Sequence, residues 1–346
     1  MRILNQSVSL TYTFSVKHLI ISLILPIAES EEPESEPEPD VSQQHEQPSM
    51  AEKFANFFSP SIQWRESEPW YTTKAATPDY LVTNSEEVGT RSYSSGWSGD
   101  QHFIAGGVLF SDLSACWYKV EWSSRDRQKC RRMAAFTACP EALPREDLLE
   151  AHETYGETVA GFAEGYEGTG QWCARGECWD LANEALKSFS QYDYVPLPLP
   201  SIRKTHGHLI YEGHASGSGF WRGGDDRIRR GDIVQWLSTT VVEKSGRTIF
   251  FGFPDHTAVI VKDQVIPGLE PYDGMELRPQ ELGRLEVVEQ SVKSPPHRNV
   301  IELAGMQKGD VWIYRPIGLE KYIGFRLEEL GGWPEGLEPM VEASDY

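Results

Sequence analysis

The sequence predicts an α+β protein, because helical spacing of apolar residues in the middle of the chain gives way to a series of short strand-like runs. Residues 144–166 carry apolar side chains at steps of three and four, which is the spacing of one helix face. Pro144 and the acidic residues after it suit the start of that helix. A second helix starts at Cys178 and keeps the same spacing as far as Phe189.

Short runs rich in β-branched and aromatic residues surround these two helices, and Gly, Pro and charged turns separate them. Two of the runs, at 103–110 and 116–122, precede the first helix. Residues 51–85 are rich in aromatics without a clear period, so we expect an irregular segment packed on the next layer. The strands expected after the second helix cover residues 209–211, 232–237, 256–262, 285–291, 300–303 and 310–315.

The composition excludes several classes of protein. The chain has 346 residues and a net charge of −20, from 52 acidic and 32 basic residues. This charge argues against binding to nucleic acid or to an anionic membrane surface, and its simplest effect is solubility. The number of cysteines is odd, the chain is long and no CxxC pair occurs, so neither a disulfide scaffold nor a structural zinc site is expected. Free thiols in a reducing compartment fit best.

The N-terminal residues leave three alternatives open. The apolar run at 18–28 is shorter than the roughly 20 residues that span a bilayer, so no membrane span is expected. It could instead be the core of a signal peptide, in which case the protein is secreted. A third alternative is that Met50 is the working start. Residues 29–50 are rich in Glu and Pro and have no Lys or Arg, so we expect a disordered linker.

Together these patterns divide the chain into four expected segments. They are a leader with a disordered acidic linker at 1–50, a β-rich N-terminal extension at 51–143, the main α+β domain at 144–320, and a C-terminal tail at 321–346.

Cys178 is the candidate nucleophile. A cysteine attacks only as the thiolate, and the unpaired N–H groups in the first turn of a helix favour an anion there. Glu177 and Asp180 act against this, since nearby carboxylates raise the pKa of a thiol. The alternative is an ordinary buried cysteine, because cysteine is among the most buried residue types.

His256 is the candidate base. It opens an apolar strand, where it would be held rigidly at a sheet edge and could pair with a thiol on a facing helix. The alternative is a surface histidine after a turn. In the next strand, Glu289 and Ser291 share one face and Gln290 takes the other. Glu289 or Ser291 could orient the imidazole as the third member of a triad.

Other motifs carry weaker signals. His206 and His208, with His214, suggest a metal site, but no matching carboxylate and histidine pattern follows. The tripeptide at 230–232 fits a turn entering a strand better than an adhesion motif, and the loop at 216–219 lacks the Lys and Ser/Thr of a phosphate loop. We therefore expect neither a metal nor a cofactor.

The order of four stretches resembles the NlpC/P60 and CHAP superfamily of papain-like thiol hydrolases. The stretches are GECWDLA at 176–182, RGDIVQW at 230–236, HTAVIV at 256–261 and VVEQS at 287–291. The resemblance implies a papain-like core with a nucleophile helix packed on an antiparallel sheet. It also implies an oxyanion donor before the cysteine, for which Gln171 is a weak candidate because it lies one residue too early. Ser291 stands where the family pattern has asparagine.

A closer resemblance extends over roughly residues 60–320. The stretches VLFSD at 108–112, AHETYG at 151–156 and WIYRP at 312–316 are similar to the cysteine-proteinase-fold domain at the C-terminus of fungal myosin tail region-interacting proteins. Those proteins are adaptors of cortical actin patches. This resemblance implies a cytoplasmic protein, possible partners among actin-patch and myosin-associated proteins, and a groove for a peptide or protein segment.

Two main functions therefore remain open from the sequence. The first is a cysteine peptidase or amidase that uses Cys178, His256 and Glu289 or Ser291. The second is a non-catalytic adaptor domain that keeps the same fold for binding. A secreted thiol amidase is the third alternative, and it depends on cleavage of the leader.

Overall fold

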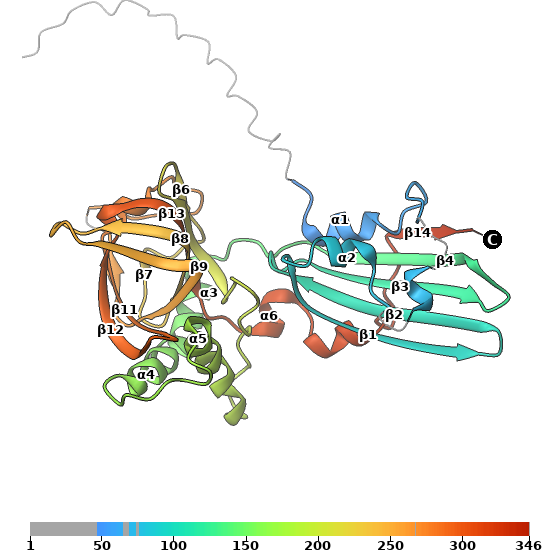
Figure 1. Cartoon of the computed structure of the whole chain (residues 1–346), viewed down its shortest axis with the longest axis horizontal. Coiled ribbons are helices and arrows are strands. Elements are labelled where there is room, and N and C mark those ends of the chain that lie inside the picture. Colours follow the sequence, from blue (N-terminus) through green and yellow to red (C-terminus); the bar gives the residue numbers. More distant parts are fainter. Residues whose placement is uncertain (1–46, 65–68, 74–75, 267, 346) are drawn as a thin grey trace, which may run out of the picture. The chain divides into compact units, whose positions relative to one another are not determined.

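Two antiparallel sheets and a layer of helices make up the computed structural model, which describes residues 47–346 except 65–68, 74–75, 267 and 346 (Figure 1). The leader and most of the expected linker, at 1–46, lie outside the described residues. The predicted α+β class is confirmed. In the described part of the chain no helix is both long and apolar enough to cross a membrane.

The first sheet contains the two strands expected before the helices, at 103–110 and 116–122, and three further strands. Its strand order over the described residues is β1-β2-β3-β4-β14, so the end of the chain returns to pair with β4. Residues 341–344 of the segment expected as a C-terminal tail are thus part of this sheet. The strands are β1 (Val88–Ser98), β2 (Gln101–Phe110), β3 (Ala115–Ser123), β4 (Asp126–Thr137) and β14 (Val341–Ser344).

Aromatic side chains form the core under this sheet. The expected irregular segment at 51–85 contains helical turns, because Ser49 caps α1 and the buried Phe54 of α1 packs on the sheet. The ring of Phe54 lies 5.3 Å from that of Phe58 and 5.7 Å from that of Tyr118. The short helices of this region are α1 (Met50–Asn56), η1 (Trp70–Thr72) and α2 (Asp79–Thr83).

The second sheet contains the strands that were expected after the cysteine helix, with different bounds. In particular, the strand expected to open at His256 begins at Thr248, so His256 lies inside it. The strand order of this sheet over the described residues is β12-β11-β9-β8-β13-β5-β6. The strands are β5 (His208–His214), β6 (Gly219–Trp221), β8 (Ile233–Val242), β9 (Thr248–Ile260), β11 (Arg284–Ser291), β12 (Ser294–Glu302) and β13 (Met306–Arg315), and a separate pair joins β7 (Arg227–Ile228) to β10 (Gln264–Val265).

Both helices predicted from apolar spacing are present. The stripe at 144–166 forms a continuous helical segment with one π turn in its middle, and the second helix begins at Cys178 as expected. The helical elements of this region are α3 (Arg145–Ala151), η2 (His152–Gly156), α4 (Glu157–Tyr166), α5 (Cys178–Lys187), η3 (Ser188–Gln191), η4 (Pro279–Glu281), η5 (Leu303–Gly305), α6 (Leu319–Ile323) and η6 (Leu327–Gly331).

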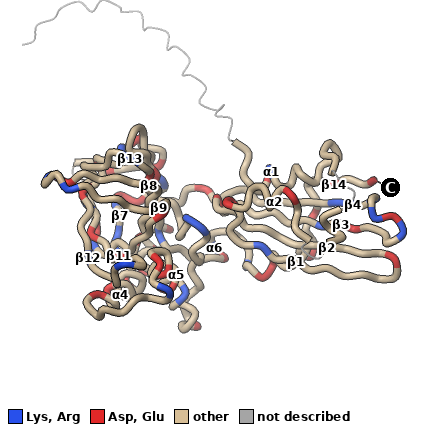
Figure 2. Tube along the Cα trace, viewed as in Figure 1, with Lys and Arg blue, Asp and Glu red and all other residues tan. Residues whose placement is uncertain are grey.

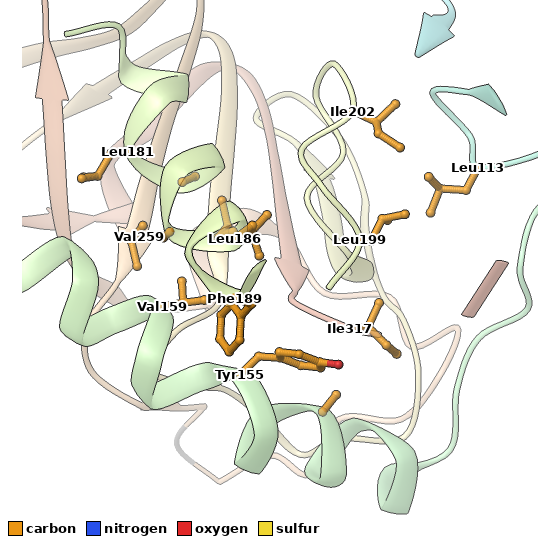
Figure 3. Packing of buried hydrophobic residues seen from close by; sticks show 14 of the residues in the cluster. Leu113, Tyr155, Val159, Leu181, Leu186, Phe189, Leu199, Ile202, Val259 and Ile317 are labelled. Carbon is orange, nitrogen blue, oxygen red and sulfur yellow. The ribbon is translucent and has the colours of Figure 1, made fainter. Parts of the chain in front are cut away.

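Successive apolar side chains along β9 and β11 point to opposite sides, so both faces of the second sheet are buried. Val259 faces the helices and joins the cluster that includes Leu181 and Phe189 (Figure 3). Val288 belongs to the same cluster. Ile260 and neighbouring residues of the same strands belong to the cluster on the other face. This arrangement fixes which side of the sheet α5 covers, and therefore where Cys178 lies.

A buried ion network joins the end of β13 to the turn before β8. The Arg315 guanidinium binds Asp232 through Nε and Nη2, at 2.8 and 2.9 Å, and also pairs with Asp225. Arg229 binds the same Asp225 with its Nε at 2.6 Å. The side chains of Arg315 and both aspartates are at most 1 % exposed. The expected turn at 230–232 is therefore structural.

Gly231 in this turn has to be glycine. Its φ is +92°, and an added Cβ would lie 2.2 Å from the carbonyl oxygen of Gly156. The close contact lets the turn pack against the π turn of the helical segment. Elsewhere basic and acidic residues are interspersed over the structure (Figure 2), and Arg230 and Arg298 both pair with Glu164 on α4.

Replacement of Arg315 by Met tests the ion network. The variant should lose about 3–5 kcal/mol of unfolding free energy, because two buried carboxylates are left without their shared cation. Urea unfolding followed by circular dichroism measures the loss. Lys244→Ala removes an exposed pair with Glu302 and is the control, for which little change is expected. A loss in Arg315→Met no larger than that of the control would contradict this account.

Candidate active site

Cys178 occupies the first position of α5, where one of the two carboxylates that could oppose a thiolate, Asp180, is held by other groups. Glu177 is the N-cap, and the buried Asp180 completes a capping box. Asp180 accepts the backbone N–H groups of Arg175 and Glu177 at 3.0 and 3.2 Å, and its other oxygen binds the Arg175 guanidinium at 2.8 Å. These three contacts compensate the negative charge of Asp180, so Asp180 opposes a thiolate at Cys178 less strongly.

Gln290 ties the turn before Cys178 to strand β11. Its side chain is fully buried. The amide oxygen accepts the N–H of Cys173 at 2.9 Å, and the amide nitrogen donates to the carbonyls of Cys173 and Glu177 at 3.1 and 2.8 Å. The strand pattern assigned Gln290 to the face opposite Glu289. That face is directed toward the turn before Cys178 and not toward His256.

His256 and Glu289 meet on neighbouring strands. The imidazole Nε2 of His256 on β9 pairs with Oε2 of Glu289 on β11, and both side chains are largely buried. The imidazole stacks on Trp236 of β8, with 5.7 Å between ring centroids and 25° between planes. On the far side of Glu289, Nδ2 of Asn299 donates to Oε1 at 2.6 Å. The base and its orienting carboxylate are therefore fixed on both sides.

The thiol and the imidazole shift each other's pKa in the direction of an ion pair. Burial alone raises the pKa of the Cys178 thiol, but hydrogen bonding and charge from His256 lower it below its ordinary value, with help from the backbone N–H groups of Thr257 and Trp179. Burial lowers the pKa of His256, but Cys178 and Glu289 together raise it to about 9. Both shifts are in the direction that favours a thiolate beside an imidazolium.

The carboxylate stays ionised despite its burial. Burial raises the pKa of Glu289, yet the hydrogen bonds from His256 and Asn299 and the charge of His297 bring it below the usual value. Glu289 therefore carries the charge that an imidazolium needs beside it, and the three groups form a Cys-His-Glu arrangement.

The structure does not bring Ser291 to the histidine. A register shift between β11 and β12 falls between Glu289 and Ser291, so the expected sharing of one face is broken at that point. The Ser291 carbonyl instead accepts the indole N–H of Trp172 at 2.8 Å, and its hydroxyl accepts the N–H of Lys293 at 3.3 Å. Of the two predicted orienting residues, only Glu289 contacts the ring.

Gln171 also lies apart from the proposed chemistry. It is exposed, and its backbone N–H donates to the hydroxyl of Thr169 at 3.1 Å. No hydrogen bond of its side chain occurs within the described part of the chain. The next residue, Trp172, has its indole N–H taken by Ser291. Neither residue supplies a donor toward the sulfur in this arrangement.

The histidines considered for a metal site bind separate partners. His206 hydrogen-bonds Ser201 at 2.8 Å and His208 hydrogen-bonds Tyr322 at 2.9 Å, while His214 pairs with Asp310. Over the residues that the structure describes, no group of three or more His, Cys, Asp or Glu side chains could hold a metal ion.

The thiolate–imidazolium pair can be tested by the pH dependence of Cys178 alkylation with iodoacetamide, followed residue by residue with mass spectrometry. In the wild type, Cys178 should react well below the ~8.5 of a free thiol. His256→Gln should move the profile upward, because burial then acts without a compensating cation. His214→Gln removes another histidine–carboxylate pair and should leave the profile unchanged. A His256→Gln profile identical to the wild type would contradict the ion pair.

Comparison with known proteins places this geometry in a family. The model of the AIM3/BBC1 cysteine proteinase-fold domain matches residues 132–327. Altered inheritance of mitochondria protein 3 of Debaryomyces hansenii is 27% identical over 273 residues, which cover 75% of this chain and 27% of that protein. The chain thus spans about a quarter of its relative's length. No solved structure gives a significant match. The predicted cysteine proteinase fold is confirmed, and the chain belongs to the AIM3/BBC1 cysteine proteinase-fold domain family.

Proposed function

We propose that the domain is a thiol hydrolase that cleaves amide bonds, as a peptidase or amidase. The observation that carries the proposal is the His256 imidazole, which pairs with the Glu289 carboxylate. His256 follows directly on Asp255, whose carbonyl lies 3.9 Å from the Cys178 sulfur. Cys178 and Glu289 both raise the pKa of His256. Cys178 is the nucleophile, His256 the proton carrier and Glu289 the residue that orients the imidazole. A buried ion pair of this kind is costly in a protein that only binds, because burial disfavours both charges.

The reaction follows from these positions. The Cys178 thiolate attacks the amide carbonyl carbon, and the imidazolium of His256 gives its proton to the leaving amine, so that a thioester remains on the sulfur. His256 then takes a proton from water, which attacks the thioester and releases the acid. The thiolate and imidazolium are regenerated. The unpaired N–H groups at the start of α5 would stabilise the negative charge on the carbonyl oxygen.

Cleavage of a peptide library, followed by mass spectrometry, tests this proposal. Wild-type protein should produce new N-termini, whereas Cys178→Ala should produce none while unfolding at the same temperature. Activity should appear as pH rises through the lowered pKa of Cys178 and fall again above about 9, where His256 loses its proton. Cys139→Ala, which changes an exposed thiol, is the control and should remain active. Turnover by Cys178→Ala would rule the mechanism out.

A second candidate function, a non-catalytic adaptor, is favoured by a separate observation. A shallow groove of about 650 Å³ runs beside α4 and α5, lined by Phe162, Tyr166, Lys187 and neighbouring residues, and it includes neither Cys178 nor His256. A peptide or protein segment could bind there without chemistry. Following the resemblance to actin-patch adaptors, such a protein would act in the cytoplasm at the cell cortex, with myosin-associated partners. Partner binding that survives in Cys178→Ala, without any cleavage by the wild type, would favour this function.

A further inference from the structure

We propose that Asn299 is a positioning residue of the active site, which holds the Glu289 carboxylate so that its second oxygen stays on His256. The inference rests on the proposed function, because it assigns a role in the same ion pair. It concerns a residue on β12 that no sequence motif singles out. The three strands β9, β11 and β12 are neighbours in the sheet. Asn299 stands opposite Val287, two residues before Glu289 on β11, so its side chain reaches Glu289 diagonally across the strand pair.

Both oxygens of Glu289 are occupied, each by a different strand. Oε2 faces His256, and Oε1 accepts Nδ2 of Asn299 at 2.6 Å. The Glu289 residue is only 7 % exposed, so water has little access to replace a lost donor. A carboxylate held at both oxygens keeps its rotation about the final side-chain bond fixed, and that rotation decides whether Oε2 reaches the imidazole.

The orientation of the Asn299 amide is itself fixed. Its Oδ1 accepts the backbone N–H of Val300 at 2.8 Å, which leaves Nδ2 to face Glu289. A flipped amide would place an oxygen against a carboxylate and lose both contacts. Asn299 is therefore set to donate, as an ionised carboxylate requires.

His297 is the other group on β12 that faces Glu289, but it does not form a hydrogen bond with the carboxylate. It stands opposite Glu289 in the strand register, but its Nε2 lies 3.8 Å from Oε1, beyond a hydrogen bond. Its Nδ1 is already beside the Pro295 carbonyl at 3.0 Å. The charged groups that act on Glu289 are thus His256 from β9 and His297 from β12, while Asn299 alone supplies the second hydrogen bond.

Asn299 acts on the Cys178 sulfur indirectly, through Glu289 and then His256. Without the Asn299 donor, the buried carboxylate is less well stabilised and free to turn, so it supports the imidazolium less. A weaker imidazolium in turn stabilises the Cys178 thiolate less. The effect of Asn299 should therefore be visible at a residue that it does not touch.

Alkylation of Cys178 by iodoacetamide over a pH series, in the full chain, tests the proposal without a substrate. Asn299→Leu keeps the volume of the side chain but removes the donor, and Asn299→Ala removes both. We expect both variants to move the Cys178 profile upward by about one pH unit, which is about a tenfold slower reaction at neutral pH. Val300→Thr, on the same strand, should behave as the wild type. Thermal unfolding confirms that each variant is folded.

The outcomes separate this inference from the proposed function. If Glu289→Gln shifts the profile and Asn299→Leu does not, Asn299 has no positioning role and the inference is overturned. If Asn299→Leu shifts it but no peptide is ever cleaved, the positioning role stands and the hydrolase proposal fails. If wild-type Cys178 titrates like a free thiol, no ion pair exists and both ideas fall.

Discussion

The buried amide of Gln290 connects the turn before Cys178 to strand β11 through three hydrogen bonds. Its neighbour on the strand, Glu289, points to the opposite face and binds His256. One dipeptide of β11 therefore holds the nucleophile turn with one side chain and the base with the other. The relative position of the thiol and the imidazole follows from the alternation of a single strand.

Packing provides the second part of the constraint. The apolar face of α5 lies on Val259 and Val288, so the helix cannot rotate or slide without exposing its core. Burial by itself would keep the thiol, the imidazole and the carboxylate neutral. Each of these groups is instead surrounded by partners that favour its charged form, which is the pattern that active sites have and that ordinary cores avoid.

Much of this arrangement could be predicted from local patterns. Apolar spacing located both helices, and with them the position of Cys178 at the start of α5. His256 was expected to open its strand, but β9 begins at Thr248 and His256 lies inside it. Glu289 was one of two predicted orienting residues, and it is the one that reaches the ring. Strand alternation failed to predict the position of Ser291. It was expected to share a face with Glu289, but a register shift in the hairpin falls between the two residues.

Features that depend on pairing between distant strands could not be found in the same way. Asn299 reaches Glu289 only through the register of β11 and β12, and no local pattern marks it. The return of the last residues of the chain to β4 depends on a partner more than 200 positions earlier, as in Val341 pairing with Ala134. Gln171 was suggested by the family resemblance although it lies one residue too early, and in the structure it is exposed.

The protonation state of His256 at pH 7.5 tests the central claim, that the fold assembles a thiolate–imidazolium pair before any substrate binds. Nitrogen-15 NMR of histidine-labelled protein reads both ring nitrogens directly. The account predicts an imidazolium protonated on both nitrogens, with a pKa of about 9. A neutral ring that titrates near the ordinary ~6.5 of histidine would show that the pair does not form and would contradict the account.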